Sequence, residues 1–330
     1  MTKTYDVVGI GNAVVDVISH GDDDFLAHMG ITKGIMQLVE RERAEVLYGA
    51  MSDRVQTPGG SVANTLAGLG ALGLNTAFVG RVKDDALGRF YAESMVAEGT
   101  AFPNAPVEGE HLPTSRSMIF VSSDGERSMN TYLGVSAELS DEDVDPAVMG
   151  QTRMLFLEGY LFDKDKGKEA FLSAAAACRH EGGLAGISLS DPFCVDRHRD
   201  SFRKLIEDEM DFVIGNEAEW LSLYETHDLD VALAQAAMIC PTLVCTRSGK
   251  PVVLRRDDEQ VEAPVQEVMP VDATGAGDQF AAGFLYGMAT GKSLEICGRM
   301  GVAAAAEVIG HVGPRPKQSM KAIFTALGLI

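Results

Sequence analysis

Six short apolar runs recur along the chain and alternate with longer segments in which apolar residues follow a helical spacing. Most of the runs are apolar throughout, which is typical of strands that are covered on both faces of a parallel sheet. This alternation predicts an α/β fold with a doubly wound, mostly parallel sheet and helices on both faces. The expected strands are residues 5–11, 76–82, 154–160, 184–189, 211–216 and 241–246, and the expected helices are residues 62–73, 86–99, 168–183 and 230–239.

Two regions depart from this alternation. Residues 13–39 and 115–133 predict strands joined by polar turns, and Asp124-Gly125 is a hairpin signal. We expect these strands to form a small β-sheet, inserted in the sequence, that lies over the main sheet as a lid. Because no linker or repeat divides the chain, we expect residues 1–330 to form one domain with ample core.

The composition argues against several kinds of partner. The formal net charge is −20, so we expect no broad surface for nucleic acid or for an anionic membrane. The apolar start of the chain is interrupted by Asp6, Gly9, Gly11 and Asp16, and therefore predicts a strand rather than a signal peptide or a membrane span. The five Cys residues form no C-x-x-C pair, which indicates reduced thiols. We expect a cytoplasmic monomer or homodimer.

The motif Gly275-Ala276-Gly277-Asp278 directly precedes a helix-like run, residues 280–289. Helix N-termini bind anions through free backbone N–H groups and a partial positive charge, and glycines let the backbone approach a phosphate closely. An ionised Asp278 in this place could accept a proton from an attacking hydroxyl. A loop followed by an ordinary acidic first turn accounts for the motif equally, because short motifs recur by accident.

A second glycine pair, Gly59 and Gly60, follows Pro58 and precedes Ser61. The order predicts a tight turn that enters a helix, with Ser61 available as its cap. The two glycines would expose backbone N–H groups to a ligand, and Asn64 lies one turn inside the helix. Simple turn chemistry is the alternative.

Two other phosphate or nucleotide motifs are excluded. Residues 68–73, G-L-G-A-L-G, match the dinucleotide fingerprint, which requires a strand before the first Gly and a helix after the last. These glycines instead lie at the end of a helical run, so we assign them to close helix packing. The chain also lacks G-x-x-x-x-G-K-[ST], which excludes a Walker-type phosphate loop.

Acidic residues lie at two further places of interest. Asn216 ends an expected strand, with Glu217 and Glu219 beside it. Open α/β sheets bind ligands at this edge, and two acids with an amide suit Mg²⁺, although a capped acidic first turn is an equal alternative. Asp16 lies in an otherwise apolar strand, where an unpaired carboxylate is costly. It either has a structural partner or faces a cleft and binds ligand hydroxyls.

Together and in this order, the segments resemble the ribokinase-like (PfkB) kinase family, from Gly11 to Gly313. DATGAGD (272–278) resembles the family's C-terminal signature, GGSVANTLAGLGALG (59–73) its N-terminal signature, and NEAE (216–219) its N-x-x-E motif. The resemblance implies a ribokinase-like fold with a lid over the substrate. It also implies transfer of the γ-phosphoryl group of ATP to a primary hydroxyl of a sugar or nucleoside.

The resemblance further implies residue roles. Asp278 resembles the base that takes the hydroxyl proton, and the amides of Gly275, Ala276 and Gly277 resemble the anion hole. Asn216 and Glu219 resemble the pair that organises Mg²⁺ and phosphate through water. The nucleotide-binding T-x-x-G turn is matched by Thr246 and Gly249, and the place where relatives often bind a monovalent cation such as K⁺ is matched by Asp272 and Thr274.

The acceptor is less narrowly defined than the reaction. The resemblance implies that the hydroxyls of the acceptor are contacted by Asp16, Gly59, Gly60 and Asn64. Residues 11–18, 156–163 and 124–134 are most similar to bacterial adenosine-kinase-type members. Apolar lid residues could flank a flat base or simply pack the inner face of the lid; they are Met36, Leu38, Met118 and Phe120.

Two alternatives remain open. One is a sugar kinase of the same family that acts on fructose, ribose or a keto-deoxy sugar acid. The other is a non-catalytic nucleoside-binding relative, against which the intact Asp278, Asn216 and Glu219 argue.

Overall fold

The computed structural model describes residues 3–109, 111–266 and 268–330. The strands of the main body are β1 Tyr5–Ile10, β5 Thr76–Val79, β6 Thr100–Ala101, β9 Thr152–Glu158, β10 Leu184–Ser188, β11 Phe212–Asn216, β12 Thr242–Arg247, β13 Lys250–Arg256 and β14 Glu259–Ala263. They form one nine-stranded sheet in the order β14-β13-β12-β11-β10-β9-β1-β5-β6. Its strands are parallel except at one edge, where β12, β13 and β14 pair antiparallel.

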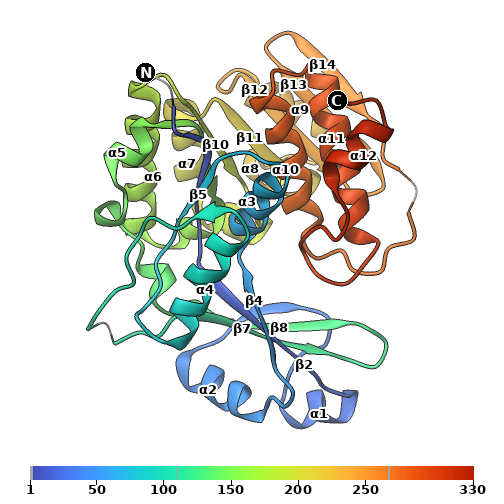
Figure 1. Ribbon diagram of the computed structural model, residues 1–330. Coiled ribbons are helices and arrows are strands. Elements are labelled where there is room, and N and C mark those ends of the chain that lie inside the picture. The colour runs from blue at the N-terminus through green and yellow to red at the C-terminus, as the bar shows by residue number, and fades with distance from the viewer. Residues whose placement is uncertain (1–2, 110, 267) are drawn as a thin grey trace.

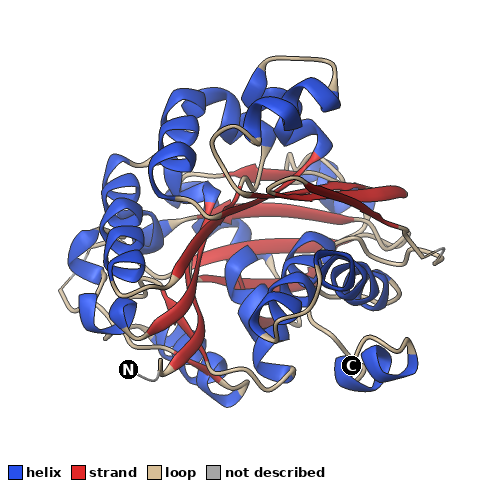
Figure 2. Cartoon of the chain, turned by 90° about the horizontal axis from the view of Figure 1, so that it is seen from above, coloured by secondary structure: helices blue, strands red, loops and turns tan. Residues whose placement is uncertain are grey.

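Helices cover both faces of this sheet, as Figure 2 shows. One side carries α3 Ser61–Ala71, α4 Ala86–Ala97, α10 Ala276–Ala289, α11 Leu294–Ile309 and α12 Met320–Ala326. The other side carries α5 Pro146–Gly150, α6 Asp165–His180, α7 Pro192–Glu209, α8 Glu217–Tyr224 and α9 Leu229–Ala236. The doubly wound α/β fold expected from the sequence is confirmed, with all six expected strands and all four expected helices.

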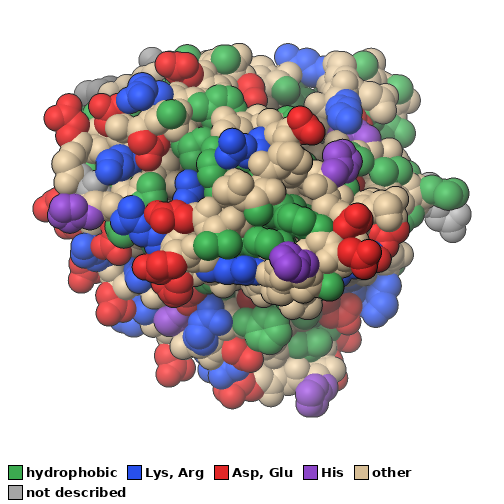
Figure 3. All heavy atoms as spheres, turned by 90° about the horizontal axis from the view of Figure 1, so that it is seen from below, with side chains coloured by type: hydrophobic (Ala, Val, Ile, Leu, Met, Phe, Trp, Pro, Cys, Tyr) green, Lys and Arg blue, Asp and Glu red, His purple; other side chains and the backbone are tan. Residues whose placement is uncertain are grey.

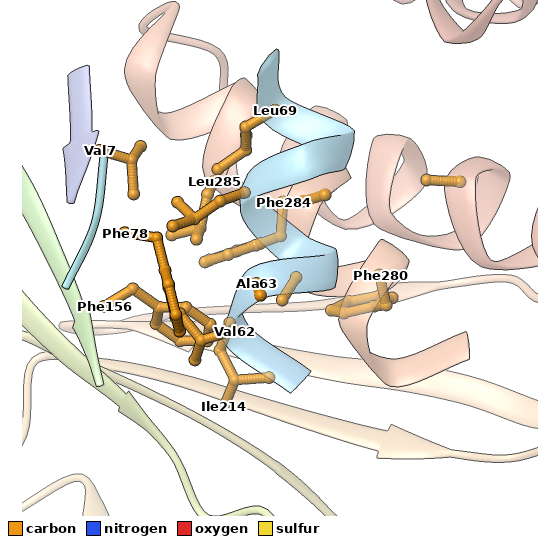
Figure 4. Packing of buried hydrophobic residues seen from close by; sticks show 14 of the residues in the cluster. Val7, Val62, Ala63, Leu69, Phe78, Phe156, Ile214, Phe280, Phe284 and Leu285 are labelled. Carbon is orange, nitrogen blue, oxygen red and sulfur yellow. The ribbon is translucent and has the colours of Figure 1, made fainter. Parts of the chain in front are cut away.

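The two cores explain why the strands are apolar throughout. Successive side chains of a strand point to opposite faces, so Val7 of β1 packs in one core and Val8 in the other. At Gly9, α3 lies so close to β1 that a Cβ would fall 2.3 Å from Val62. Figure 4 shows Val62 beside Phe156 and Ile214 of the sheet. This packing holds the N-terminus of α3 at the carboxyl edge of the strands.

A second, five-stranded sheet lies below the main body in Figure 1. Its strands are β2 Val14–His20, β3 Met36–Leu38, β4 Val55–Gly59, β7 Ser115–Val121 and β8 Arg127–Tyr132, in the order β3-β8-β7-β2-β4. The small inserted sheet expected from residues 13–39 and 115–133 is therefore present. Strand β4 was not predicted, because Pro and Gly at 58 and 59 weaken the strand signal.

Residues 23–28 correct one detail of that prediction, because they form helix α1 (Asp23–His28) and not a strand. Asp22 accepts a hydrogen bond from the Phe25 amide, and acidic residues in the first turn suit the helix dipole. Helices α1 and α2 (Arg41–Ala50) cover the face of the lid that points away from the main body (Figure 1). Phe25 of α1 contacts Phe120 of β7 there, with ring centroids 5.2 Å apart.

The surface on the lid side carries mixed charge. Figure 3, which views the molecule from below, shows Lys and Arg side chains interspersed with Asp and Glu rather than gathered into one basic patch, over the described part of this face. Within the described residues, none of the helices combines the length and the apolar character that crossing a membrane requires.

Candidate active site

A cleft of about 900 Å³ lies between the lid and the carboxyl edge of the main sheet. The main body contributes residues that follow β1, β9, β10, β11 and β12, and the lid contributes residues of β2, β3, β7 and β8. Open α/β sheets bind ligands at this edge. Of the predicted site residues, the cleft is lined by Asp16, Met36, Gly60, Asn64, Asn216, Glu219, Thr246, Thr274, Gly277 and Asp278.

The mouth of α10 lies at the wall of this cleft. Gly275 is its N-cap, with φ of 81°, and no side chain caps the helix. A side chain at Gly275 would be strained by this φ and would meet Pro314 at 2.5 Å, so the position requires glycine. The Ala276 amide bonds to the Ala273 carbonyl at 3.2 Å, within the turn itself. Of the three predicted anion-hole residues, Gly277 faces the cleft, and a Cβ there would enter open space.

Asp278 is held by α3, on the other side of a close helix contact. Its carboxylate accepts hydrogen bonds from Ser61 Oγ at 2.6 Å and from Asn64 Nδ2 at 3.0 Å. Burial raises the pKa of Asp278 to about 6, although these two donors oppose the rise. Gly68 permits the approach of the two helices, because a Cβ there would lie 2.3 Å from Gln279 Oε1. The packing assignment is thus correct for Gly68, whereas Gly73 follows the end of α3 with a left-handed φ of 84°.

Ser61 differs from its prediction. It is the first residue of α3 rather than the cap, and its hydroxyl is used for Asp278. The N-cap is Gly60, whose φ of 99° and close approach to the Asn12 carbonyl (2.4 Å from a Cβ) require glycine. Gly60 provides no side-chain cap, and in the first turn of α3 the Val62 amide donates to the Glu158 carboxylate instead.

Asp16 is buried on β2, and burial raises its pKa to about 6 against the charges of Arg127 and Arg315. Gly59, on the neighbouring strand β4, makes room for this carboxylate, because a Cβ there would lie 2.6 Å from it. Among the described residues, no ion pair within bonding distance includes Asp16, which lines the cleft as a carboxylate with open hydrogen-bonding capacity.

Glu158, at the end of β9, is a buried site residue that the sequence analysis missed. It accepts hydrogen bonds from the Asn12 amide (3.1 Å), from Asn12 Nδ2 (2.8 Å) and from the Val62 amide (3.2 Å). Burial raises its pKa to about 7. Its contacts join β1, β9 and α3 beneath the cleft. The sequence signal was a polar residue at the end of an apolar strand, which is also the signal that identified Asn216.

The mouth of α8 is capped by its own side chains. The Asn216 amide and Nδ2 donate to the two Glu219 oxygens at 2.8 and 2.7 Å, and the Glu219 amide donates to Asn216 Oδ1 at 2.9 Å. Burial raises the pKa of Glu219 to about 7. The capping alternative is confirmed, and both side chains also line the cleft. Each carboxylate oxygen keeps one free lone pair, so the donor set fits a water-mediated contact to Mg²⁺.

Asp272 already has a cationic partner. Its carboxylate accepts from Arg127 Nη1 of the lid at 2.8 Å, and from the amides of Thr274 and Gly313 at 2.9 Å each. Burial raises the pKa of Asp272, but these hydrogen bonds and the Arg127 charge outweigh burial, and the pKa lies below its usual value. In the part of the chain that the structure describes, no three His, Cys, Asp or Glu residues group as a metal site. The Arg127–Asp272 pair links the lid to the α10 mouth.

The two residues predicted to form the nucleotide-binding turn lie in different surroundings. Thr246 lies near the end of β12 and lines the cleft, whereas Gly249 lies in the exposed turn between β12 and β13. Ser248 beside it adopts a left-handed φ of 52°.

The apolar wall of the cleft differs in part from the prediction. Met36 and Leu38 line it, together with Met129 of β8. Met118 and Phe120 do not, and their expected contact with a ligand is corrected: both are fully buried on the opposite face of the lid, among residues of α1 and α2. Side chains alternate along a strand, so it is Ser117, next to Met118, that faces the cleft.

Phe193, at the start of α7, is a second residue that the sequence analysis missed. It lines the cleft opposite the lid and is 71% exposed, which is high for a Phe side chain. The apolar residues of the lid and Phe193 form what we call the apolar wall, defined as Met36, Leu38, Met129 and Phe193.

A buried carboxylate at a helix mouth without a side-chain cap, under a lid, suits an enzyme that transfers a phosphoryl group to a hydroxyl of a small molecule. The comparison with known families specifies which class of these enzymes the chain belongs to. The chain belongs to the pfkB family of carbohydrate kinases, whose pattern it matches over residues 24–320. It is therefore a phosphotransferase with an alcohol group as acceptor, a sugar or nucleoside kinase, and the kinase family implies ATP as the co-substrate.

The similar proteins include both an adenosine kinase and sugar kinases. The adenosine kinase from Sinorhizobium meliloti is 45% identical, with 98% of this chain and 99% of that chain covered and a TM-score of 0.89. A probable sugar kinase protein from Rhizobium etli CFN 42 is 42% identical over the whole of both chains, with a TM-score of 0.91. Fructokinase from Escherichia coli is 29% identical over 81% of this chain and 88% of its own length.

Proposed function

We propose that the protein transfers the γ-phosphoryl group of ATP to the 5′-hydroxyl of adenosine, in the presence of Mg²⁺. The observation that carries this proposal is the division of the cleft into two parts. Polar groups gather where a ribose would bind, at Asp16, Asn64 and Asp278. The apolar wall lies on other elements. Its lid residues are on β3 and β8, which β7 separates from Asp16 on β2, and Phe193 is on α7; together they suit the faces of a flat base.

Each polar group has a task in this proposal. The Asp278 carboxylate accepts the proton of the 5′-hydroxyl as the new P–O bond forms, and the open mouth of α10 stabilises charge on the transferred group. Of the three residues predicted to form the anion hole, Gly277 lines the cleft and would supply its amide there. Asn216 and Glu219 would hold Mg²⁺ through water, and the ion supplies neutralisation of phosphate charge. Asp16 accepts hydrogen bonds from the adjacent 2′- and 3′-hydroxyls.

We also propose a cellular context. Residues 1–330 act as one catalytic domain, with a lid built from residues 13–39 and 115–133. The protein works in the cytoplasm, where its five buried free thiols stay reduced. At Asp272 the Arg127 guanidinium supplies the positive charge that a monovalent cation would bring.

A substrate panel tests the acceptor. Adenosine, inosine, 2′-deoxyadenosine, ribose and fructose are compared by kcat/KM with ATP and Mg²⁺. We expect adenosine to be the best substrate and free ribose to be poor, because ribose lacks the base that the apolar wall covers. 2′-Deoxyadenosine should be much poorer than adenosine, because it leaves a buried carboxylate without its partner, and Asp16→Ala should narrow that gap.

The panel also contains the outcome that contradicts the proposal. A sugar kinase is the second candidate, since a fructokinase and a probable sugar kinase are among the similar proteins. If fructose or ribose has the highest kcat/KM, the adenosine assignment is wrong and the sugar kinase replaces it. If no acceptor is phosphorylated but adenosine still binds, the non-catalytic alternative replaces both.

A further inference from the structure

The segment from Gly313 to Arg315 lies directly behind the α10 mouth. The Gly313 amide donates to Asp272 at 2.9 Å, and the Pro314 carbonyl accepts from Gln279 Nε2 at 3.1 Å. Pro314 packs against Gly275 so closely that no side chain fits between them. These contacts fix the backbone of the segment relative to Asp278, so the side chain of Arg315 starts from a rigid base.

Arg315 reaches from this segment to Asn64 on α3. Its Nε donates to Asn64 Oδ1 at 3.2 Å, and its guanidinium forms an ion pair with Glu98, at the end of α4. The Arg315 side chain is 18% exposed and does not line the cleft. Neither the motifs nor the family resemblance pointed to it.

The contact decides which way the Asn64 amide faces. Arginine has only donors, so it must meet the oxygen of the Asn64 side chain. The opposite end of that amide, Nδ2, then faces Asp278 Oδ2 at 3.0 Å. If the amide turned over, its oxygen would lie against the Asp278 carboxylate, and two acceptors would repel each other.

We propose that Arg315 is a positioning residue for phosphoryl transfer: it fixes the orientation of the Asn64 amide and, through it, the carboxylate of Asp278. Glu98 in turn holds the guanidinium in place. The inference rests on the proposed role of Asp278 as base. A purely structural Arg315, by contrast, would staple the 313–315 segment to α4 and would act on stability rather than through Asn64.

A double-mutant cycle separates the two roles. Arg315→Met is measured in the native background and in an Asn64→Ala background, with kcat determined at saturating ATP and adenosine. We expect a loss of about tenfold in the native background, because a small misplacement of a reacting group is costly. In the Asn64→Ala background the same change should have little further effect. Equal losses in both backgrounds would overturn the proposal.

Two matched variants test whether the loss belongs to the Arg315–Asn64 hydrogen bond. Arg89→Met makes the same substitution on α4, where Arg89 forms an exposed ion pair with Asp84, and should leave kcat unchanged. Arg315→Lys keeps the pair with Glu98 and one donor for Asn64, and should recover part of the lost kcat even if the Met variant folds poorly. A Lys variant as impaired as a folded Met variant would contradict positioning through a hydrogen bond.

The pH profile is a second readout, measured in the native and the Asn64→Ala backgrounds. Loss of the Arg315 charge by itself raises the pKa of Asp16 in both backgrounds, so positioning predicts a larger shift in the native background. Hydrogen bonds from Ser61 and Asn64 lower the pKa of Asp278, and the Asp278 charge in turn raises the pKa values of the neighbouring Asp16 and Glu158. Losing the Asn64 donor should move the acid limb of kcat/KM to higher pH in Arg315→Met. An unmoved limb, or an equal shift in both backgrounds, contradicts the proposal. If Asp278→Asn keeps near-normal turnover, the proposed function fails instead, whatever the cycle shows.

Discussion

Helices α8 and α10 begin in similar ways in sequence and differently in structure. Each carries an acid at its third residue, Glu219 in α8 and Asp278 in α10, and each begins at the edge of the same cleft. In α8 the N-cap is Asn216, which exchanges hydrogen bonds with Glu219. In α10 the N-cap is Gly275, which has no side chain, and Asp278 turns away to α3.

The difference teaches what makes a helix mouth an anion site. A helix N-terminus has unpaired N–H groups, and a capping box satisfies two of its donors internally. Glu219 is long enough to reach back to the N-cap amide, so α8 uses its acid for itself. Asp278 is shorter and the N-cap offers no partner, so the Gly277 amide and the remaining lone pairs of the Asp278 carboxylate are left for a ligand.

The largest expected effect breaks the comparison at α10. Asp278→Asn preserves the shape of the side chain and removes the proton acceptor, so turnover should fall by about 10²–10⁴-fold. Folding and ATP affinity should change little. Steady-state kinetics with a melting curve measure both.

A control separates base catalysis from a simple change of charge at a helix start. Asp230→Asn alters an exposed acid in the first turn of α9 and should leave turnover unaffected. Near-normal turnover in Asp278→Asn would mean that the open mouth of α10 holds phosphate without supplying a base.

A pH titration sharpens the comparison, with smaller effects. The base must be ionised, so kcat/KM should fall about tenfold per pH unit below the Asp278 pKa of about 6. The free energy of unfolding should change with pH in the opposite direction to kcat/KM. Burial raises both the Asp278 pKa (about 6) and the Glu219 pKa (about 7), so the native state keeps protons that the unfolded chain has lost, and the free energy of unfolding falls as pH rises through this window.

The carboxyl groups of Asp278 and Glu219 should titrate over different parts of that pH range. Asp278→Asn should flatten the fall in melting temperature between about pH 4 and 6, and Glu219→Gln should flatten it up to about pH 7. Melting curves of the ligand-free protein at several pH values measure this. A melting temperature that rises with pH across the window in the native protein contradicts the raised pKa values.

The sequence predicted the sheet and the α10 motif because both depend on local patterns. Apolar runs covered on two faces identify the strands, and glycines before an acid identify the mouth of a helix. Contacts between distant segments were not predictable in the same way. Nothing in the neighbourhood of Ser61 or Arg127 reveals that one meets Asp278 and the other Asp272.

The face to which a strand residue points was also beyond the sequence. Met118 and Ser117 are neighbours on β7, and a shift of one residue in register exchanges which of them faces the cleft. The expectation that apolar lid residues face the ligand fails here, because helices pack on the outer face of β7 and bury Met118 and Phe120 there. Phe193 was missed for another reason, because an exposed Phe in the first turn of a helix resembles any other surface residue.

The smallest expected effect concerns α8. Glu219→Gln leaves one acceptor where the carboxylate had two, so the capping box loses one hydrogen bond and stability should fall by about 1 kcal/mol. If Glu219 also holds Mg²⁺ through water, the Mg²⁺ concentration for half-maximal activity should rise as well, and this is the outcome we expect. Glu217→Gln, on the same helix but outside the capping box, is the matched control. An unchanged Mg²⁺ response beside the stability loss would leave α8 as a helix that caps only itself.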